Sequence, residues 1–364
     1  MEQNILDLFP AASTDLIRFN LYLSIGFVGV TLGIFSIILF SRWRDGVRYA
    51  RRRKVEQDIQ GFLTSYLFDD QTDKEAILVF TEQFTQKRVQ RHIVLENLVS
   101  LHKNLIGESA DKLRNLYCQS GLESYSRQKL YASSWHEIAQ GINELANMGV
   151  RKYSELIRAF INHPHPTLRS EAQVALLKLE TNAPFSFLDD LREPLLDWQQ
   201  LQLARATSKS KFLSIPNFER WLGKSEESIV IFCLRMIASY GQHSAADGIL
   251  SLLQHPAAKI REEAIITLRQ LNTHEAVPSL INMFTNESTD IQLEILKAVP
   301  AIGDQQSIPF FEQVLGFENR RLQLAAARAL CQSGQEGQNK VLAIKNDPEH
   351  ALQQLAATAL SYKA

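Results

Sequence analysis

Cysteine is scarce in this sequence of 364 residues: Cys118, Cys233 and Cys331 are present, and they form no CxxC pair. The sequence therefore offers neither a disulfide framework nor the closely spaced thiols of a structural zinc site. Three scattered cysteines are typical of a protein in a reducing compartment. Cys233 and Cys331 fall within predicted helices, where a buried thiol packs as a small apolar side chain.

Catalytic and phosphate-binding motifs are also missing. The sequence has no glycine-rich phosphate loop, no Ser/His/Asp order and no convincingly spaced carboxylate pair. His136-Glu137 and His274-Glu275 are the His-Glu pairs, and they lie at non-equivalent positions of the repeat described below, so they do not converge on a metal. We therefore expect no catalytic residues, no metal and no cofactor.

Net charge is close to zero, at -1. Eight of the 39 basic and four of the 40 acidic residues precede position 55, so residues 55–364 carry 31 cations and 36 carboxylates. A protein that binds nucleic acid along a groove needs the opposite excess. We therefore expect no nucleic-acid partner.

One long hydrophobic run is present, and it lies near the N-terminus. Residues 21–40 contain no charged side chain, and twenty helical residues span about 30 Å, the thickness of the hydrocarbon core. A cleaved signal peptide is the competing interpretation, but it requires a basic start and a shorter apolar core, whereas residues 1–20 are mildly acidic. The sequence predicts a single transmembrane helix over 21–40.

A basic segment at 41–55 follows this run and sets its orientation. Seven cations oppose Asp45, and they are Arg42, Arg44, Arg48, Arg51, Arg52, Arg53 and Lys54. By the positive-inside rule, residues 1–20 lie outside and the rest is cytoplasmic, with a bacterial inner membrane expected. The same cations are expected to contact anionic lipid headgroups; nucleic-acid binding or a specific lipid site is the alternative.

Small residues share one face of the predicted span: Gly26, Gly29, Gly33 and Ser36 are spaced by three, four and three residues. Such a face allows another helix to approach closely, whether from a partner or from a second copy of the chain. Glycine is also common in solitary spans, so both interpretations stay open.

A helical repeat organises the second half of the chain. Ile260, Ala264 and Leu268 share a helix face, and the same pattern starts again 31 residues later at Ile291 and at Leu322. Backward steps of 31 reach Ile229, then Trp198, then the residue before Leu168, and a last copy starts near Leu352. Pro278 and Pro309 repeat at the same interval. The period predicts stacked helix pairs.

We expect the solenoid to occupy residues 135–364, after a helical connector or capping region at 56–134. Each unit has a first helix, a polar turn and a second helix rich in Ala and Leu, and no unit can bury its apolar stripe alone. Departures from the pattern are expected at 197–206 and at Pro300, which interrupts a predicted helix.

The second-helix sequences Ile-Arg-Glu-Glu-Ala-Ile-Ile-Thr-Leu at 260–268 and Leu-Arg-Ser-Glu-Ala-Gln-Val-Ala-Leu at 168–176 resemble HEAT repeats, in the short form common in bacterial HEAT-like proteins. The resemblance implies an all-α solenoid whose second helices line an inner, protein-binding face. The candidate contact residues on second helices are Arg169, Arg261, Arg320, Arg321 and Arg328. An ordinary solvated helix face is the competing interpretation.

The predicted function is that of a membrane-anchored, non-enzymatic scaffold or accessory subunit, whose protein partner is an integral membrane protein or complex. The resemblance suggests envelope machinery, such as a polysaccharide-synthesising glycosyltransferase complex. A membrane-tethered lyase or isomerase built on HEAT-like repeats is the alternative, and a homo-oligomer formed through the membrane helix is a third possibility.

Overall fold

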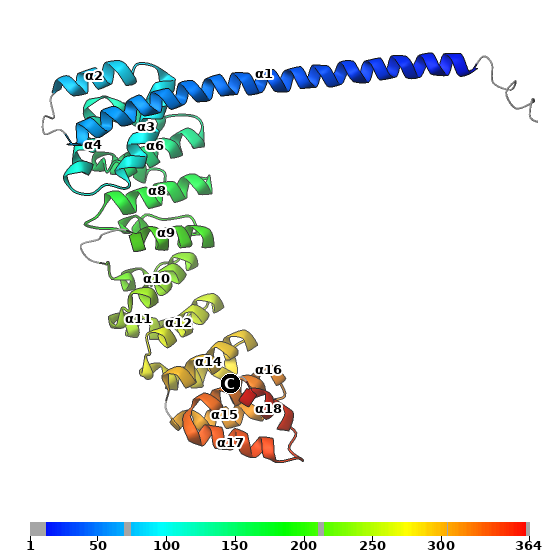
Figure 1. The fold of residues 1–364 in the computed structure, drawn as a ribbon. Coiled ribbons are helices and arrows are strands. Elements are labelled where there is room, and N and C mark those ends of the chain that lie inside the picture. The colour runs from blue at the N-terminus through cyan, green and yellow to red at the C-terminus, as the bar shows by residue number, and fades with distance from the viewer. Residues whose placement is uncertain (1–11, 69–73, 210–214, 304, 362–364) are drawn as a thin grey trace, which may run out of the picture. The chain divides into compact units, whose positions relative to one another are not determined.

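The computed structural model describes residues 12–68, 74–209, 215–303 and 305–361. Within these ranges every regular element is a helix (Figure 1). The chain divides into two compact units, Met1–Ser126 and Arg127–Ala364. The predicted all-α class is thereby confirmed.

The first unit is built on one very long helix, α1 (Ala12–Phe68), followed by α2 (Lys74–Phe84), α3 (Arg88–His102) and α4 (Glu108–Gln119). The predicted span and basic segment are therefore parts of a single helix that starts before residue 21 and continues beyond residue 55. Within the connector the sequence also predicts a break at Gly107, and the structure has one there, because this glycine precedes α4 with φ of 67°. A second break, which the sequence predicts at Asp69-Asp70, lies outside the described residues.

The two ends of α1 have different surroundings. Its large apolar side chains between Phe19 and Phe40 are exposed, and the helix contains a window apolar enough to cross a membrane, with a mean hydropathy of 2.4. Its C-terminal end packs against α2 and α3, and Ile59, Leu63 and Tyr66 are buried there. Apolar burial thus fixes one end of α1 to the unit while the other end stays uncovered.

The second unit is a stack of helix pairs. Its helices after α5 (Leu122–Lys129), in which the division between the units falls, are α6 (Trp135–Asn147), α7 (Ser154–Arg158), α8 (Pro166–Leu179), α9 (Asp197–Lys209), α10 (Glu227–Tyr240), α11 (Ala246–Leu252), α12 (Ala258–Gln270), α13 (Val277–Met283), α14 (Thr289–Ile302), α15 (Ile308–Leu315), α16 (Arg320–Gln332), α17 (Gly334–Asn346) and α18 (Gln353–Ser361).

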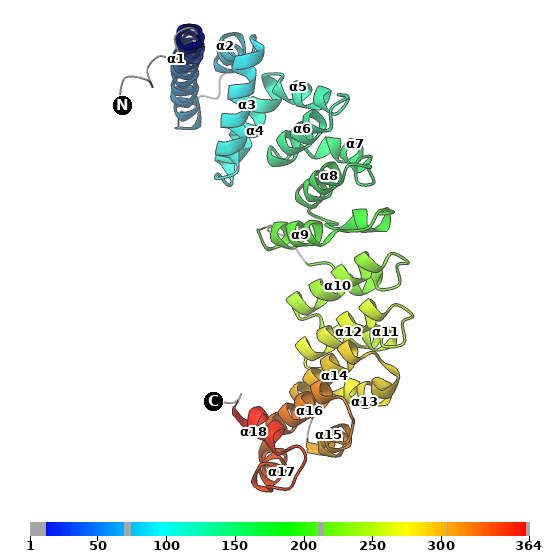
Figure 2. The same ribbon diagram turned by 90° about the vertical axis from the view of Figure 1, so that its right-hand side faces the viewer.

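First and second helices lie on opposite sides of this stack. The second helices α8, α10, α12, α14 and α16 form one side, and the first helices α7, α11, α13 and α15 form the other (Figure 2). The second helices α8, α12, α14 and α16 pack on the first helices α7, α11, α13 and α15, whereas α10 packs on a 3₁₀ turn at Phe218–Trp221. The helices α10, α12, α14, α16 and α18 pack on one another in sequence. The core is the continuous apolar layer between the two sides, as a repeat architecture requires.

The repeat interval is confirmed, with one correction. The third residue of every second helix from α8 to α16 is buried, and these residues are Leu168, Gln199, Ile229, Ile260, Ile291 and Leu322. Gln199 therefore takes the place predicted for Trp198, whose side chain is 40% exposed. The single 30-residue step falls between α9 and α10 rather than before α9.

The two predicted departures lie elsewhere or are absent. Residues 197–206 form the regular helix α9, and the irregular segment is 180–196, where a short 3₁₀ turn (Ser186–Asp189) stands in place of a first helix. Pro300 does not interrupt α14, which continues to Ile302. It lies in the last turn, so any bend that its ring causes moves only the final residues of α14.

Candidate partner-binding surface

Arg169 and Arg261, expected from the sequence on an open helix face, are directed into the turns before their own helices. Arg169 is 5% exposed, and its Nη1 donates to the carbonyl oxygens of His163 and Pro164 at 3.0 and 3.1 Å. Arg261 repeats the geometry, with Nη1 donating to the carbonyls of His255 and Pro256 at 2.8 and 3.0 Å. Both arginines therefore fasten the turn before their own helix.

Other second helices use glutamine for the same purpose. The three glutamines occupy the position of Arg261 in α9, α14 and α16, and each donates to a backbone carbonyl before its helix: Gln200 to Leu195, Gln292 to Phe284 and Gln323 to Leu315. Buried carbonyls at a turn require a donor. In the sequence, an Arg or Gln recurs directly after the first apolar position of the repeat, and this pattern is the signal by which the turn-fastening role could have been recognised.

Arg261 also binds the following repeat. Its Nε and Nη2 donate to the two carboxylate oxygens of Glu287 at 2.7 and 2.8 Å, and the Glu287 side chain is 8% exposed. Hydrogen bonding to Glu287 raises the pKa of Arg261, an effect larger than the opposing effect of burial. A bidentate pair of this kind fixes the position of α12 relative to the turn before α14.

Two other predicted arginines do meet on the second-helix side. Arg321 and Arg328 lie along α16 and line a groove of about 580 Å³. Arg269 on α12 and Lys297 on α14, which the sequence reasoning missed, complete the set of four cations. We call this the basic groove. Arg320 is exposed at the start of α16, outside the lining of the groove.

The floor of the basic groove is apolar. Leu293 and Leu296 of α14 and Leu324 of α16 line it, and Ala359 of α18 contributes to one side. The Glu294 carboxylate lies 3.6 Å from Arg269 and also pairs with Lys297. An apolar floor bordered by cations suits a segment that presents both an apolar side chain and a carboxylate.

A second groove, of about 610 Å³, lies on the same side across α9, α10 and α12. Five carboxylates and two cations line it, and they are Asp197, Glu226, Glu227, Glu262, Glu263, Arg235 and Lys259. Arg235 is held by Glu263 at 3.0 Å and donates to Gln200 at 2.9 Å. The remaining excess of negative charge makes this the acidic groove.

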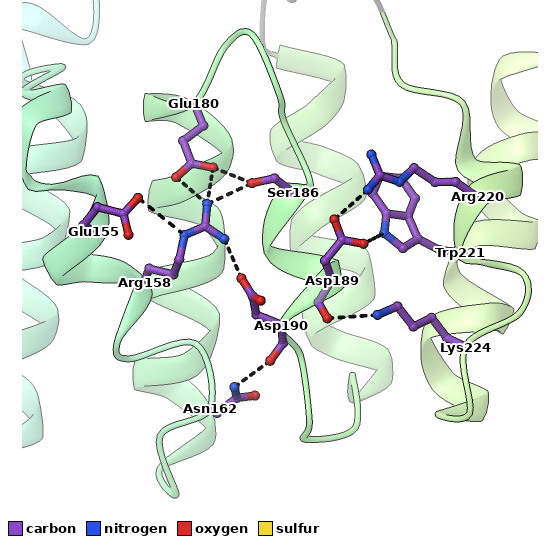
Figure 3. Close-up of polar contacts among 10 residues, drawn as sticks. All are labelled: Glu155, Arg158, Asn162, Glu180, Ser186, Asp189, Asp190, Arg220, Trp221 and Lys224. Atoms are coloured by element: carbon purple, nitrogen blue, oxygen red, sulfur yellow. Dashed lines mark hydrogen bonds and ion pairs between the residues drawn. The ribbon is translucent and has the colours of Figure 1, made fainter.

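The opposite side of the stack holds a polar network around the irregular segment (Figure 3). Arg158 donates through Nη2 to both carboxylate oxygens of Glu180 at 2.7 Å and through Nη1 to Asp190 at 3.0 Å. Burial lowers the pKa of Arg158, but the bonds and charges of these carboxylates outweigh it, so the pKa is raised overall. The network links the end of α7 to the segment that replaces a first helix.

Asp189 extends the network to the following repeat. Its carboxylate accepts from Arg220 at 2.7 Å and from the Trp221 indole at 2.8 Å, and its carbonyl accepts from Lys224 at 2.9 Å (Figure 3). A hollow of about 570 Å³ beside Arg158 is lined by groups already engaged in this network, including Asp190 and Asn162. These contacts stabilise a unit that lacks a first helix, and they account for the charges there.

The predicted membrane residues all lie on α1. An added Cβ at Gly26, Gly29 or Gly33 would meet no atom within 4 Å, and Ser36 shares their exposed surface. A helix partner at this face stays a prediction.

The seven cations of the basic segment of α1 are also exposed. Arg52 differs from its neighbours because it binds Glu56 at 2.7 Å and Glu96 of α3 at 2.6 Å. Its hydrogen bond to Glu56 and the charge of Glu96 raise the pKa of Arg52. This cation helps to fix α1 on its unit, whereas contact of the other six with lipid stays a prediction.

Comparison with known proteins concerns the C-terminal part most directly. Residues 277–361 match the model of HEAT repeats. That range begins at the first residue of α13 and ends at the last residue of α18. These findings support a HEAT-repeat protein.

A solved structure also supports the helical fold. A crystal structure of a Kap121p mutant aligns with a TM-score of 0.52 and 11% identity, over 84% of this chain and 42% of that one. The CpcE–CpcF complex of phycocyanin lyase from Nostoc (TM-score 0.29, 22% identity, 57% and 75% coverage) and human deoxyhypusine hydroxylase (0.31, 13%, 77% and 97%) are also similar. At these identities the likeness concerns the fold alone. No curated protein matches the sequence.

The HEAT match and the basic groove coincide. Three of the four cations, Lys297, Arg321 and Arg328, lie within the matched repeats. Among the described residues, no group of three His, Cys, Asp or Glu side chains is placed to hold a metal ion. Exposed and half-buried cations therefore lie beside apolar side chains in this groove.

Proposed function

We propose that this protein is a membrane-anchored HEAT-repeat scaffold, without enzyme activity of its own, that holds a protein partner at the cytoplasmic face of a membrane. The main support is the second-helix side of the stack, where the basic and acidic grooves together have a volume of about 1,200 Å³. Both grooves are lined by charged side chains and by leucines. Repeat stacks bind partners through such extended surfaces.

The membrane part of the proposal is supported by α1. Its uncovered apolar length is followed directly by seven exposed cations, which is the arrangement that retains a segment on the cytoplasmic side. Because the other end of the same helix packs on α2 and α3, the anchor and the first unit would move together. A partner that is itself an integral membrane protein would contact both the anchor and the first unit.

Site-specific photo-crosslinking of the full chain in its native membrane tests the binding face. A photoreactive phenylalanine derivative at Leu324, in the basic groove, is compared with the same residue at Gln313, which is exposed on the first helix α15. We expect one discrete crosslinked protein from position 324 and none from position 313. Equal yields from both positions, or no product from either, would refute binding by the second-helix side.

Two further measurements complete the test. Mass spectrometry of the crosslinked band identifies the partner, and an envelope glycosyltransferase complex is one candidate that it would reveal or dismiss. Alkaline carbonate washing of membranes should leave the full chain in the pellet and release a variant that lacks residues 1–40. Release of the full chain would contradict the membrane anchor without bearing on the binding face.

A further inference from the structure

The acidic and basic grooves are adjacent, because both are lined by α12. Glu262 and Glu263 of this helix face the acidic groove, whereas Arg269, two turns further along, lines the basic groove. The second-helix side therefore changes sign along the stack: five carboxylates against two cations across α9 to α12, then four cations across α12 to α18. The change of sign occurs within one continuous surface.

The distance between the two charged regions follows from helix packing. The acidic groove is centred near α10 and the basic groove between α14 and α16. Packed helices lie about 8–10 Å apart, so the centres are separated by about 20–25 Å. About seven residues of extended chain cover this distance.

The charge pattern discriminates among classes of partner. A polyanion such as nucleic acid, or the flat anionic surface of a bilayer, would be attracted to the four cations but repelled by the carboxylates of the neighbouring helices. A polypeptide segment can present both signs, and it can also fill the floor formed by Leu293, Leu296 and Leu324. The pattern favours a protein segment with its charges in two blocks.

We propose that the second-helix side binds an extended polypeptide segment carrying a cluster of lysine or arginine and a cluster of aspartate or glutamate about seven residues apart. The basic cluster lies in the acidic groove and the acidic cluster in the basic groove, so the charges fix the direction in which the segment lies along the stack. This inference rests on the proposed function and specifies the partner chemistry of the same surface.

Three fluorescent peptides test the inference by anisotropy with the full chain in an uncharged detergent. The block peptide has three lysines, a seven-residue neutral spacer containing leucine, and three glutamates. The mixed peptide has the same composition with lysine and glutamate alternating at those six positions, and the third peptide has glutamates at both ends. At about 50 mM salt we expect the block peptide to bind at least about tenfold more tightly than the mixed peptide, with the difference lost at about 500 mM salt because the charges are then screened.

Two variants reverse one groove each. Glu227→Lys with Glu262→Lys should abolish the preference for the block peptide and favour the peptide with glutamates at both ends. Lys297→Glu with Arg321→Glu should weaken the block peptide by at least about tenfold. The helical content of each variant, measured by circular dichroism, shows whether it is folded. If a variant does not fold, the comparison of the block and mixed peptides on the unmodified protein still tests the inference.

Block and mixed peptides that bind equally, or fail to bind, overturn the inference. If the crosslink from position 324 is nevertheless obtained, the partner is bound by other chemistry and the scaffold function stands. If neither the crosslink nor the peptide preference is obtained, both proposals fall.

Discussion

Replacing Arg261 by leucine is expected to destabilise the stack locally, although it removes no residue of either groove. The substitution leaves the Glu287 carboxylate, which is 8% exposed, without its bidentate partner. It also removes the donor to the carbonyls of His255 and Pro256. The loss therefore falls on the turn before α12 and the turn before α14 together.

The expected magnitude follows from the pair that is broken. Removing one partner of a buried ion pair costs about 3–5 kcal/mol, because an uncompensated charge remains. A value near 3 kcal/mol applies here, since the Arg261 side chain is 19% exposed and water can partly replace it. The double variant Arg261→Gln with Glu287→Gln should recover most of this loss, because it removes both charges and glutamine makes the equivalent carbonyl bond in α9, α14 and α16.

Hydrogen exchange followed by mass spectrometry is the suitable assay, because a repeat stack can open one unit at a time. Amides of residues 255–262 and 284–292 should exchange about a hundredfold faster in Arg261→Leu, while those of α8 are unchanged. The double variant should lie within about tenfold of the unmodified protein. Exchange in Arg261→Leu within about threefold of the unmodified protein would refute the structural role of this arginine.

Three more outcomes are expected. Burial, together with the charges of His165 and Arg169, lowers the pKa of His163 in the native state. The contribution of this histidine to stability is therefore fully present above its ordinary pKa near 6.5 and is lost as the pH falls below that value. Between pH 7.5 and 5.5 the melting temperature of the His163→Asn variant should fall by less than that of the unmodified protein. Phe185→Ala should lower the unfolding free energy by about 3–5 kcal/mol in urea titrations, since this side chain is fully buried, and a loss below about 1 kcal/mol would contradict its packing. Gly29→Ile with Gly33→Ile should convert any detergent-solubilised oligomer to a monomer by light scattering, and an unchanged mass would dismiss the glycine face as its interface.

The periodic elements of this fold could be predicted because stacking imposes a repeated apolar pattern. Ile260, Ile291 and Leu322 are buried in equivalent places, so the interval was visible in the sequence alone. Gln199 was not recognised, because a buried glutamine breaks the apolar pattern; it is satisfied by donating to the carbonyl of Pro166 at 3.0 Å. A single 30-residue step next to it shifted the alignment onto Trp198.

The orientation of the candidate arginines could not be read from the sequence, for a physical reason. An arginine in a repeat can point into a turn or out to solvent, and the residue type alone does not distinguish these two orientations. Arg169 and Arg261 recur directly after the first apolar position and take the buried role. Arg321 and the half-buried Arg328 line the basic groove together with Lys297. Only the angular position around the helix separates the two groups, and it needs an accurate alignment of the repeats.

The continuity of α1 gives the N-terminal helix a fixed angular phase. Gly29 and Ile59 are thirty residues apart on one helix, which at about 100° per residue leaves their outward directions about 120° apart. Any rotation of the apolar end about the helix axis therefore turns the face that packs on α3 by the same angle. One residue inserted between them would change this phase by about 100°, whereas seven would nearly preserve it and add about 10 Å of length.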